Sequence, residues 1–191
     1  MRRALIVSCV LSGSACGGEA PAGPKEVPAA APADPAQGRA KQAVGGFKRA
    51  LKAALTAALA EGGPKHALAV CQREAPRLAA AASGAGLTVG RATLRPRNPA
   101  NLAEGWKREA HEALERAKDR QTATWTAELP SGALAYAEPL VIDSVCLTCH
   151  GASVASDVAV ALRELYPDDR ATGYALGDFR GIAWAEVERA R

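Results

Sequence analysis

Two cysteines and a histidine at a fixed spacing are the residues of this chain best suited to hold a cofactor. Cys146, Cys149 and His150 form the run Cys146-Leu147-Thr148-Cys149-His150. Residues at i, i+3 and i+4 of a helix share one face, so two thiols and an imidazole can address the same flat molecule. C-x-x-C-H is the attachment signature of a c-type haem, in which the thiols bond to the porphyrin edge and the imidazole to the iron. The motif therefore predicts one covalent haem c per chain.

Two other uses of a cysteine pair fit the sequence less well. A zinc site needs further Cys or His ligands at suitable spacing, and the sequence has no second pair of this kind. A redox dithiol of the thioredoxin kind belongs to a βαβ context and requires no histidine directly after the second cysteine. Covalent haem is the favoured interpretation.

The sequence restricts the second ligand of a haem iron to a short set of side chains. Because the only methionine is Met1, the mature protein cannot use a His/Met pair. The remaining candidates are His66, His111, Cys71, a lysine, or no protein ligand. Both histidines are expected to be solvated, since neither lies on the apolar stripe of its helix. Cys71 does lie on an apolar stripe, where an inert buried cysteine and an iron ligand are equally good interpretations.

The N-terminus has the pattern of an export signal. Arg2 and Arg3 precede a short apolar run, residues 4–11, which is followed by a small-residue cleavage region at 12–15. The apolar run is too short to span a bilayer, and no other segment of the sequence is long enough. We therefore expect an extracytoplasmic, periplasmic protein.

Cys16 follows the small residues directly, which favours a lipoprotein signal with Cys16 as the lipidated first residue. Gly13 occupies the position where a bulky aliphatic residue is usual, so ordinary cleavage after Ala15 is the alternative. The expected organisation is a signal peptide at 1–15, a Pro/Ala-rich tether at 16–36 and a haem domain at 37–191. Membrane contact is expected only through the lipid anchor.

The charge of the chain gives no support for a nucleic-acid partner. Loss of Arg2 and Arg3 lowers the formal net charge from +4 to +2, because no acidic residue leaves with them. Two haem propionates would bring it near zero. The sequence also holds no block of Lys and Arg that would mark a polyanion site.

Hydrophobic periodicity predicts how the rest of the chain is organised. Helical spacing over 44–59 and 64–82 predicts two helices separated by Gly62-Gly63, with Pro76 expected to kink or break the second one. The elements expected after them are a strand at 87–95, a helix at 101–118 with a capping-box start at Asn101, strands at 122–129 and 133–142, the motif helix ending in a left-handed Gly151, a helix from 156 and a strand at 181–187. Helices followed by a small antiparallel sheet with a helical insert indicate an α+β fold.

Several segments occur together in an order that resembles one known family. They are Ala69-Val70-Cys71 with Ala75-Pro76, Gly90-Arg91-Ala92-Thr93 through Arg97-Asn98-Pro99-Ala100-Asn101, the C-x-x-C-H run with Gly151, Tyr166-Pro167-Asp168-Asp169, Gly173-Tyr174 and Gly177-Asp178-Phe179-Arg180-Gly181. From about residue 40 to the end, the chain resembles a bacterial family of exported c-type haem proteins with a PAS-like fold. The resemblance implies that the sheet and helices are PAS-like and that Cys71 is the second iron ligand beside His150. The family's usual serine after the first arginine is Thr93 here.

Three arginines are candidates for contacts with the haem propionates. Arg91, Arg95 and Arg97 share parity on an extended segment, and the guanidinium fork suits carboxylates. Arg91 and Arg95 are the predicted contacts, with Arg91 the stronger candidate. A solvated strand edge is the alternative interpretation.

Two functions follow from such a haem. The first is a low-potential sensor module in which reduction or a diatomic gas displaces Cys71 and switches the protein between two states. The alternative is an electron-transfer cytochrome c, with a redox protein as its partner. We expect no enzyme, because a cysteine ligand would block the open iron position that a peroxidase needs. No Ser/His/Asp set, paired-carboxylate signature or phosphate loop is present.

Overall fold

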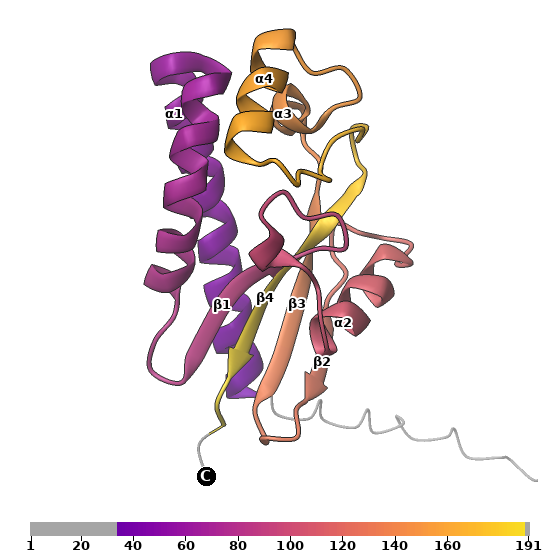
Figure 1. Cartoon of the computed structure of the whole chain (residues 1–191). Coiled ribbons are helices and arrows are strands. Elements are labelled where there is room, and N and C mark those ends of the chain that lie inside the picture. Colours follow the sequence, from indigo (N-terminus) through magenta and orange to yellow (C-terminus); the bar gives the residue numbers. More distant parts are fainter. Residues whose placement is uncertain (1–33, 190–191) are drawn as a thin grey trace, which may run out of the picture. The chain divides into compact units, whose positions relative to one another are not determined.

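A four-stranded antiparallel sheet organises residues 34–189, the part of the chain that this computed structural model describes (Figure 1). The strands are β1 (Leu87–Ala92), β2 (Trp125–Glu128), β3 (Leu134–Val141) and β4 (Phe179–Val187). Their order is β1-β4-β3-β2, and each neighbouring pair is antiparallel. The predicted α+β class with a small antiparallel sheet is confirmed, and the arrangement is consistent with a PAS-like fold.

A helical hairpin covers one face of the sheet. Helix α1 (Pro35–Ala82) doubles back at Gly62 and Gly63, the two residues within it that leave helical geometry, and Figure 1 shows its two arms side by side. Gly63 has φ 68° and ψ −168°, a conformation essentially limited to glycine. The break predicted at Gly62-Gly63 is therefore confirmed. Val44 and Phe47 of the first arm are buried against β1, β3 and β4.

Of the kink or break expected at Pro76, the break does not occur. Backbone angles around it stay helical, and the arm runs on to Ala82. Proline frees the carbonyl four residues earlier, here that of Gln72. Both Pro76 and Gln72 are exposed, while Ala75 between them is buried in the domain. Water can therefore satisfy the freed carbonyl while packing holds the helix together.

The opposite face of the sheet packs against α2 (Trp106–Glu115). Successive side chains of a strand point to opposite faces, and β4 shows this clearly. Its Ile182 joins Leu114 of α2 in one apolar cluster, whereas Ala183 joins Phe47 of α1 in another. The sheet is thus a middle layer between the hairpin and α2.

The segment between β1 and α2 differs from prediction. β1 ends at Ala92, and Asn101 lies in the short helix η1 (Pro99–Asn101) instead of starting α2. The Thr93 N–H donates to the Asn101 carbonyl, and the Ala103 N–H donates to the Thr93 carbonyl. These bonds keep the chain extended beyond Asn101, so α2 begins only at Trp106, after Gly105 with φ 52°.

The C-x-x-C-H run follows the end of β3 and lies next to α4, which in turn stands beside α1 (Figure 1). It forms η2 (Ser144–Cys146) and the single turn α3 (Leu147–His150), and α4 (Ser156–Leu165) follows. Leu68 of α1 packs with Cys149 and with Val158 and Leu162 of α4. This cluster holds the motif opposite the second arm. Within residues 34–189, no helix combines the length and apolarity needed to cross a bilayer.

Candidate haem site

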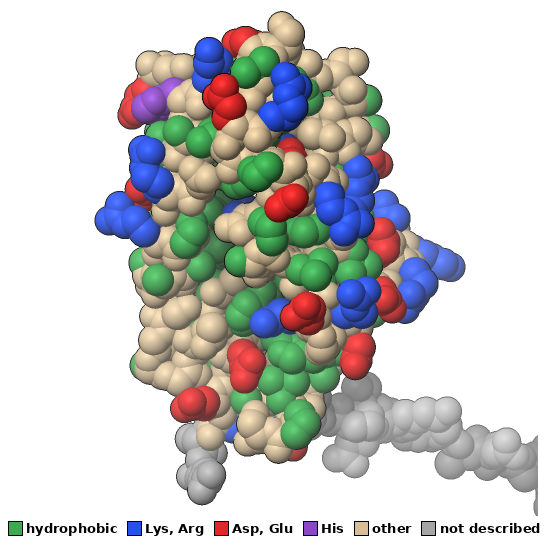
Figure 2. All heavy atoms as spheres, viewed as in Figure 1, with side chains coloured by type: hydrophobic (Ala, Val, Ile, Leu, Met, Phe, Trp, Pro, Cys, Tyr) green, Lys and Arg blue, Asp and Glu red, His purple; other side chains and the backbone are tan. Residues whose placement is uncertain are grey.

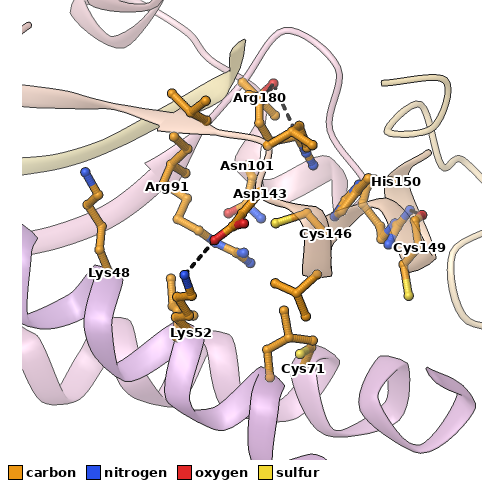
Figure 3. Close-up of a pocket in the computed structure, with 18 of the residues that line it drawn as sticks. Lys48, Lys52, Cys71, Arg91, Asn101, Asp143, Cys146, Cys149, His150 and Arg180 are labelled. Atoms are coloured by element: carbon orange, nitrogen blue, oxygen red, sulfur yellow. Dashed lines mark hydrogen bonds and ion pairs between the residues drawn. The ribbon is translucent and has the colours of Figure 1, made fainter. Parts of the chain in front are cut away.

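A cavity of about 410 Å³ lies where α1, the motif segment and one end of the sheet meet. Its volume falls within the roughly 300–1,000 Å³ typical of cofactor pockets. Figure 3 shows side chains from all three regions directed into it. Leucines of both arms of α1 supply apolar wall, and cationic side chains approach from the sheet side. The lining includes Leu51, Leu55, Leu59, Leu68, Cys71, Arg91, Arg97, Asn101, Cys146, Cys149, His150, Tyr166 and Arg180.

The single turn of α3 brings all three motif side chains to this cavity. Cys149 is buried, while Cys146 and His150 are half-buried, and none of the described cysteines forms a disulfide. Gly151 ends the turn in extended backbone, with φ −66° and ψ 171°, so the expected left-handed conformation is wrong. Glycine is required for a different reason, because a Cβ here would lie 2.6 Å from the Leu147 carbonyl oxygen.

The His150 imidazole is held in one tautomer. Its Nδ1 lies 2.6 Å from the Ala171 carbonyl oxygen. A carbonyl can only accept, so Nδ1 carries the proton and Nε2 keeps a free lone pair. Burial, reinforced by the nearby charges of Arg97 and Arg180, lowers the His150 pKa to about 3. A neutral imidazole anchored through its other ring nitrogen is the form in which histidine binds metals.

Cys71 reaches the same cavity from the second arm of α1, facing the motif (Figure 3). The thiol is half-buried. Burial raises its pKa, while the positive charges of Arg91 and Arg97 act in the opposite direction. The structure therefore brings Cys71 together with Cys146, Cys149 and His150.

The model of the Tll0287-like family matches residues 31–187. The chain belongs to the Tll0287-like family. A solved structure, that of the cyanobacterial haem protein Tll0287, superposes with a TM-score of 0.61 at 23% identity, covering 83% of this chain and 99% of that one. At that identity the match supports the fold. No curated protein matches the chain.

The arginines of this Tll0287-like chain do not share one role. Arg91 lines the cavity, and no ion pair between described residues involves it. Arg95 is directed elsewhere: its guanidinium donates to the carbonyls of Arg170 and Thr172 and lies 4.3 Å over the Tyr174 ring. Arg95 does not share the face of Arg91 as predicted, because β1 ends at Ala92 and the alternation of an extended strand stops there.

Arg97 lines the cavity, and two of its three guanidinium nitrogens are held by protein groups. Its Nε donates to Asp169 Oδ2 at 3.1 Å, and its Nη2 donates to the Cys149 carbonyl at 2.6 Å. The side chains of this ion pair are only 11% and 10% exposed. Arg97 therefore ties the motif turn to the loop that carries Ala171.

Several lining residues received no role from the sequence. Arg180 donates through Nη1 to Thr93 Oγ1 at 3.2 Å, and burial lowers its pKa to about 10. Lys48 and Lys52 reach the cavity from the first arm of α1, where they pair with Glu138 and Asp143. Their i, i+4 spacing beside the leucine stripe was a usable signal. The sequence held no comparable signal for Arg180, apart from its place in one of the segments that carry the family resemblance.

The two other histidines do not line the cavity. His66 is exposed and lies 3.5 Å from Glu61, which confirms its solvated interpretation. The same expectation for His111 is wrong, because this side chain is only 4% exposed. His111 points from α2 toward the sheet and packs edge-on against Phe179. Its Nε2 accepts a hydrogen bond from the Leu94 N–H. Cys16, the signal and the tether up to residue 33 lie outside the described residues.

Proposed function

We propose that this chain carries one covalent haem c, with Cys146 and Cys149 bonded to the porphyrin and His150 bonded to the iron. The observation that carries the proposal is the His150 imidazole, which presents an unprotonated Nε2 beside two free thiols of one cavity. The solved structure matched by this chain is described as that of a haem protein, which supports the same assignment.

The residues present fit such a group. The leucine walls suit a flat apolar ring, and Arg91 offers a cation without an ion-pair partner among the described residues, as a propionate requires. Arg91 is therefore retained as the propionate contact, while Arg95 is left out. A bare metal ion fits less well, because residues 34–189 contain no group of three or more Cys, His, Asp or Glu side chains suited to hold one.

Cys71 is the proposed second axial ligand. It shares the cavity with His150 from the opposing element, and iron coordination would keep its thiol deprotonated against the burial that raises its pKa. When bound, the haem would supply one-electron chemistry, and a thiolate donor places such a centre at low potential.

The favoured role is a low-potential redox- or gas-responsive sensor module, because a cysteine on a separate helical arm can leave while His150 stays anchored. The alternative is an electron-transfer cytochrome c, which the partial exposure of Cys146 favours. Carbon monoxide tests the two: rapid binding to the reduced protein supports the sensor. An iron that stays six-coordinate in both oxidation states, with fast exchange to a soluble acceptor, supports the carrier.

The proposed location is extracytoplasmic, with Cys16 as a lipid-anchored first residue and cleavage after Ala15 without lipid as the alternative. Both rest on the sequence pattern. The mass of the purified N-terminal peptide separates them.

Covalent attachment is tested by expressing the full chain in cells that mature c-type cytochromes. Wild-type protein should retain haem after denaturation and run as a haem-stained band. Replacing both Cys146 and Cys149 by alanine should abolish the stained band, because no thioether can form. Cys71→Ala is the matched control, since it removes a thiol from the same cavity and should leave the band intact. Loss of haem from denatured wild type would overturn the proposal.

A further inference from the structure

Asp169 has a side chain only 10% exposed, and the proposed function gives it no role. It belongs to the loop between α4 and β4 and does not line the main cavity. Its hydrogen-bonded contacts with the motif therefore pass through other residues. Two contacts lead from it to the motif.

The first contact runs through the backbone. Asp169 Oδ1 accepts from the Ala171 N–H at 2.8 Å, and the carbonyl of the same residue accepts from His150 Nδ1 at 2.6 Å. The carboxylate thus fixes the peptide that holds the imidazole. Flanking backbone bonds continue the connection, since the Tyr174 N–H donates to the His150 carbonyl and the Gly173 N–H to that of Gly151.

The second contact runs through Arg97. Asp169 Oδ2 accepts from Arg97 Nε at 3.1 Å, and Arg97 Nη2 donates to the Cys149 carbonyl at 2.6 Å and to the Ala171 carbonyl at 3.4 Å. One carboxylate therefore holds both partners of the His150 hydrogen bond, the motif turn on one side and the accepting carbonyl on the other.

The energetics favour a positioning role for this pair. The desolvation cost of a buried ion pair offsets much of its attraction, so the pair is a weak source of stability by itself. The pair instead restricts geometry. The rigid guanidinium fork and the two carboxylate oxygens hold Arg97, the motif turn and the Ala171 loop in a fixed relative position.

We propose that Asp169, acting through Arg97 and the Ala171 peptide, is a positioning residue that fixes the orientation and donor strength of His150. The proposal rests on the proposed haem site. A strong bond from Nδ1–H to a carbonyl raises the basicity of the ligating nitrogen. Weakening the Asp169 contacts should therefore loosen the imidazole and make it a poorer donor to iron.

The test compares Asp169→Ala and Asp169→Asn with wild type, using the haem-loaded full chain reduced under carbon monoxide. The measured quantity is the hydrogen-exchange rate of His150 Nδ1–H by NMR. Asp169→Ala removes both hydrogen bonds of the carboxylate and should speed exchange about tenfold, a factor within the range expected when hydrogen bonds of ordinary net strength are lost. Asp169→Asn should give a smaller increase, because its side-chain oxygen can still accept from the Ala171 N–H. Asp168→Ala is the control and should change nothing, since Asp168 is exposed.

The reduction potential gives a second reading. A weaker His150 donor and the loss of a buried negative charge both stabilise ferric iron less, so Asp169→Ala should raise the potential while Asp168→Ala does not. A merely structural ion pair would lower the unfolding temperature and leave the exchange rate at the wild-type value, and that result overturns the proposal. If Asp169→Ala does not fold, Asp169→Asn decides: unchanged exchange overturns the proposal, and faster exchange supports it.

The same preparations separate this inference from the proposed function. Wild-type protein that loses its haem on denaturation contradicts covalent attachment. The His150 exchange rate is then measured on the haem-free full chain, where Asp169→Ala must still speed exchange for the positioning role to hold.

Discussion

In the proposed site, Cys71 determines whether the iron has a second protein ligand. The sequence left it as ligand or inert core cysteine, and the structure places it in the same cavity as His150. His111, once a competing ligand, lies under α2 and outside that cavity. Local spacing could predict the motif because it fits within one helical turn. It could not place Arg95 or His111, since both depend on where β1 ends and how α2 packs.

If the proposed haem site holds, the Cys71→Ala variant keeps the covalent haem but loses a thiolate donor. We expect a changed low-spin ferric EPR signal, a shifted absorption spectrum and a higher reduction potential, because thiolate favours ferric iron. Leu78→Ala, two turns further along the same arm and packed against the sheet cluster, is the control for helix destabilisation. Matching spectra of Cys71→Ala and wild type would show that Cys71 is a core cysteine.

At the scale of elements, the turn in α1 decides whether Cys71 reaches the motif at all. The Gly-Gly pair marked this turn in the sequence because only glycine tolerates the backbone of Gly63. Pro76 alone did not predict a break, since the effect of a proline depends on whether the carbonyl it frees faces water. The late start of α2 was also beyond prediction, because it depends on hydrogen bonds between Thr93 and a segment that follows it.

Gly63→Ala should destabilise the domain by about 1–3 kcal/mol, the cost of forcing a side chain into this conformation. Because the second arm carries Cys71, the variant should also disturb the ferric spectrum. Gly46→Ala is the matched control: this glycine is helical and a Cβ there meets nothing within 4 Å, so it should stabilise by about 0.5–1 kcal/mol. Urea unfolding followed by circular dichroism measures both. Equal changes in stability from the two substitutions would contradict the special role of Gly63 in the turn of α1.

At the scale of the whole molecule, charge is dispersed on the surface and concentrated inside. Figure 2 shows acidic and basic side chains intermingled on the face in view. Within the fold, by contrast, Arg91, Arg97 and Arg180 converge on one cavity, and His111 is buried on the opposite side of the sheet. The global pH dependence of stability should therefore come from buried groups more than from the surface.

His111 provides the clearest case. Burial lowers its pKa below 6.5, outweighing Glu115 and Glu112, which raise it, while Arg108 on α2 and Arg180 on β4 lower it further. Its Nε2 must also stay unprotonated to accept from the Leu94 N–H at 3.3 Å. The folded domain therefore resists a proton that the unfolded chain accepts.

Stability should consequently fall as the pH drops below about 6.5, because the unfolded chain then binds the proton first, with a slope of at most about 1.4 kcal/mol per pH unit from this residue. His111→Gln should be less stable at neutral pH and should lose this share of the slope. Leu114→Ala, from the same buried face of α2, should instead lower stability by about 2–5 kcal/mol at every pH. Urea unfolding of the haem-loaded chain between pH 5 and 8 distinguishes a loss of stability that is equal at every pH from one that changes with pH. A slope in His111→Gln as steep as in wild type would assign the pH dependence to other groups.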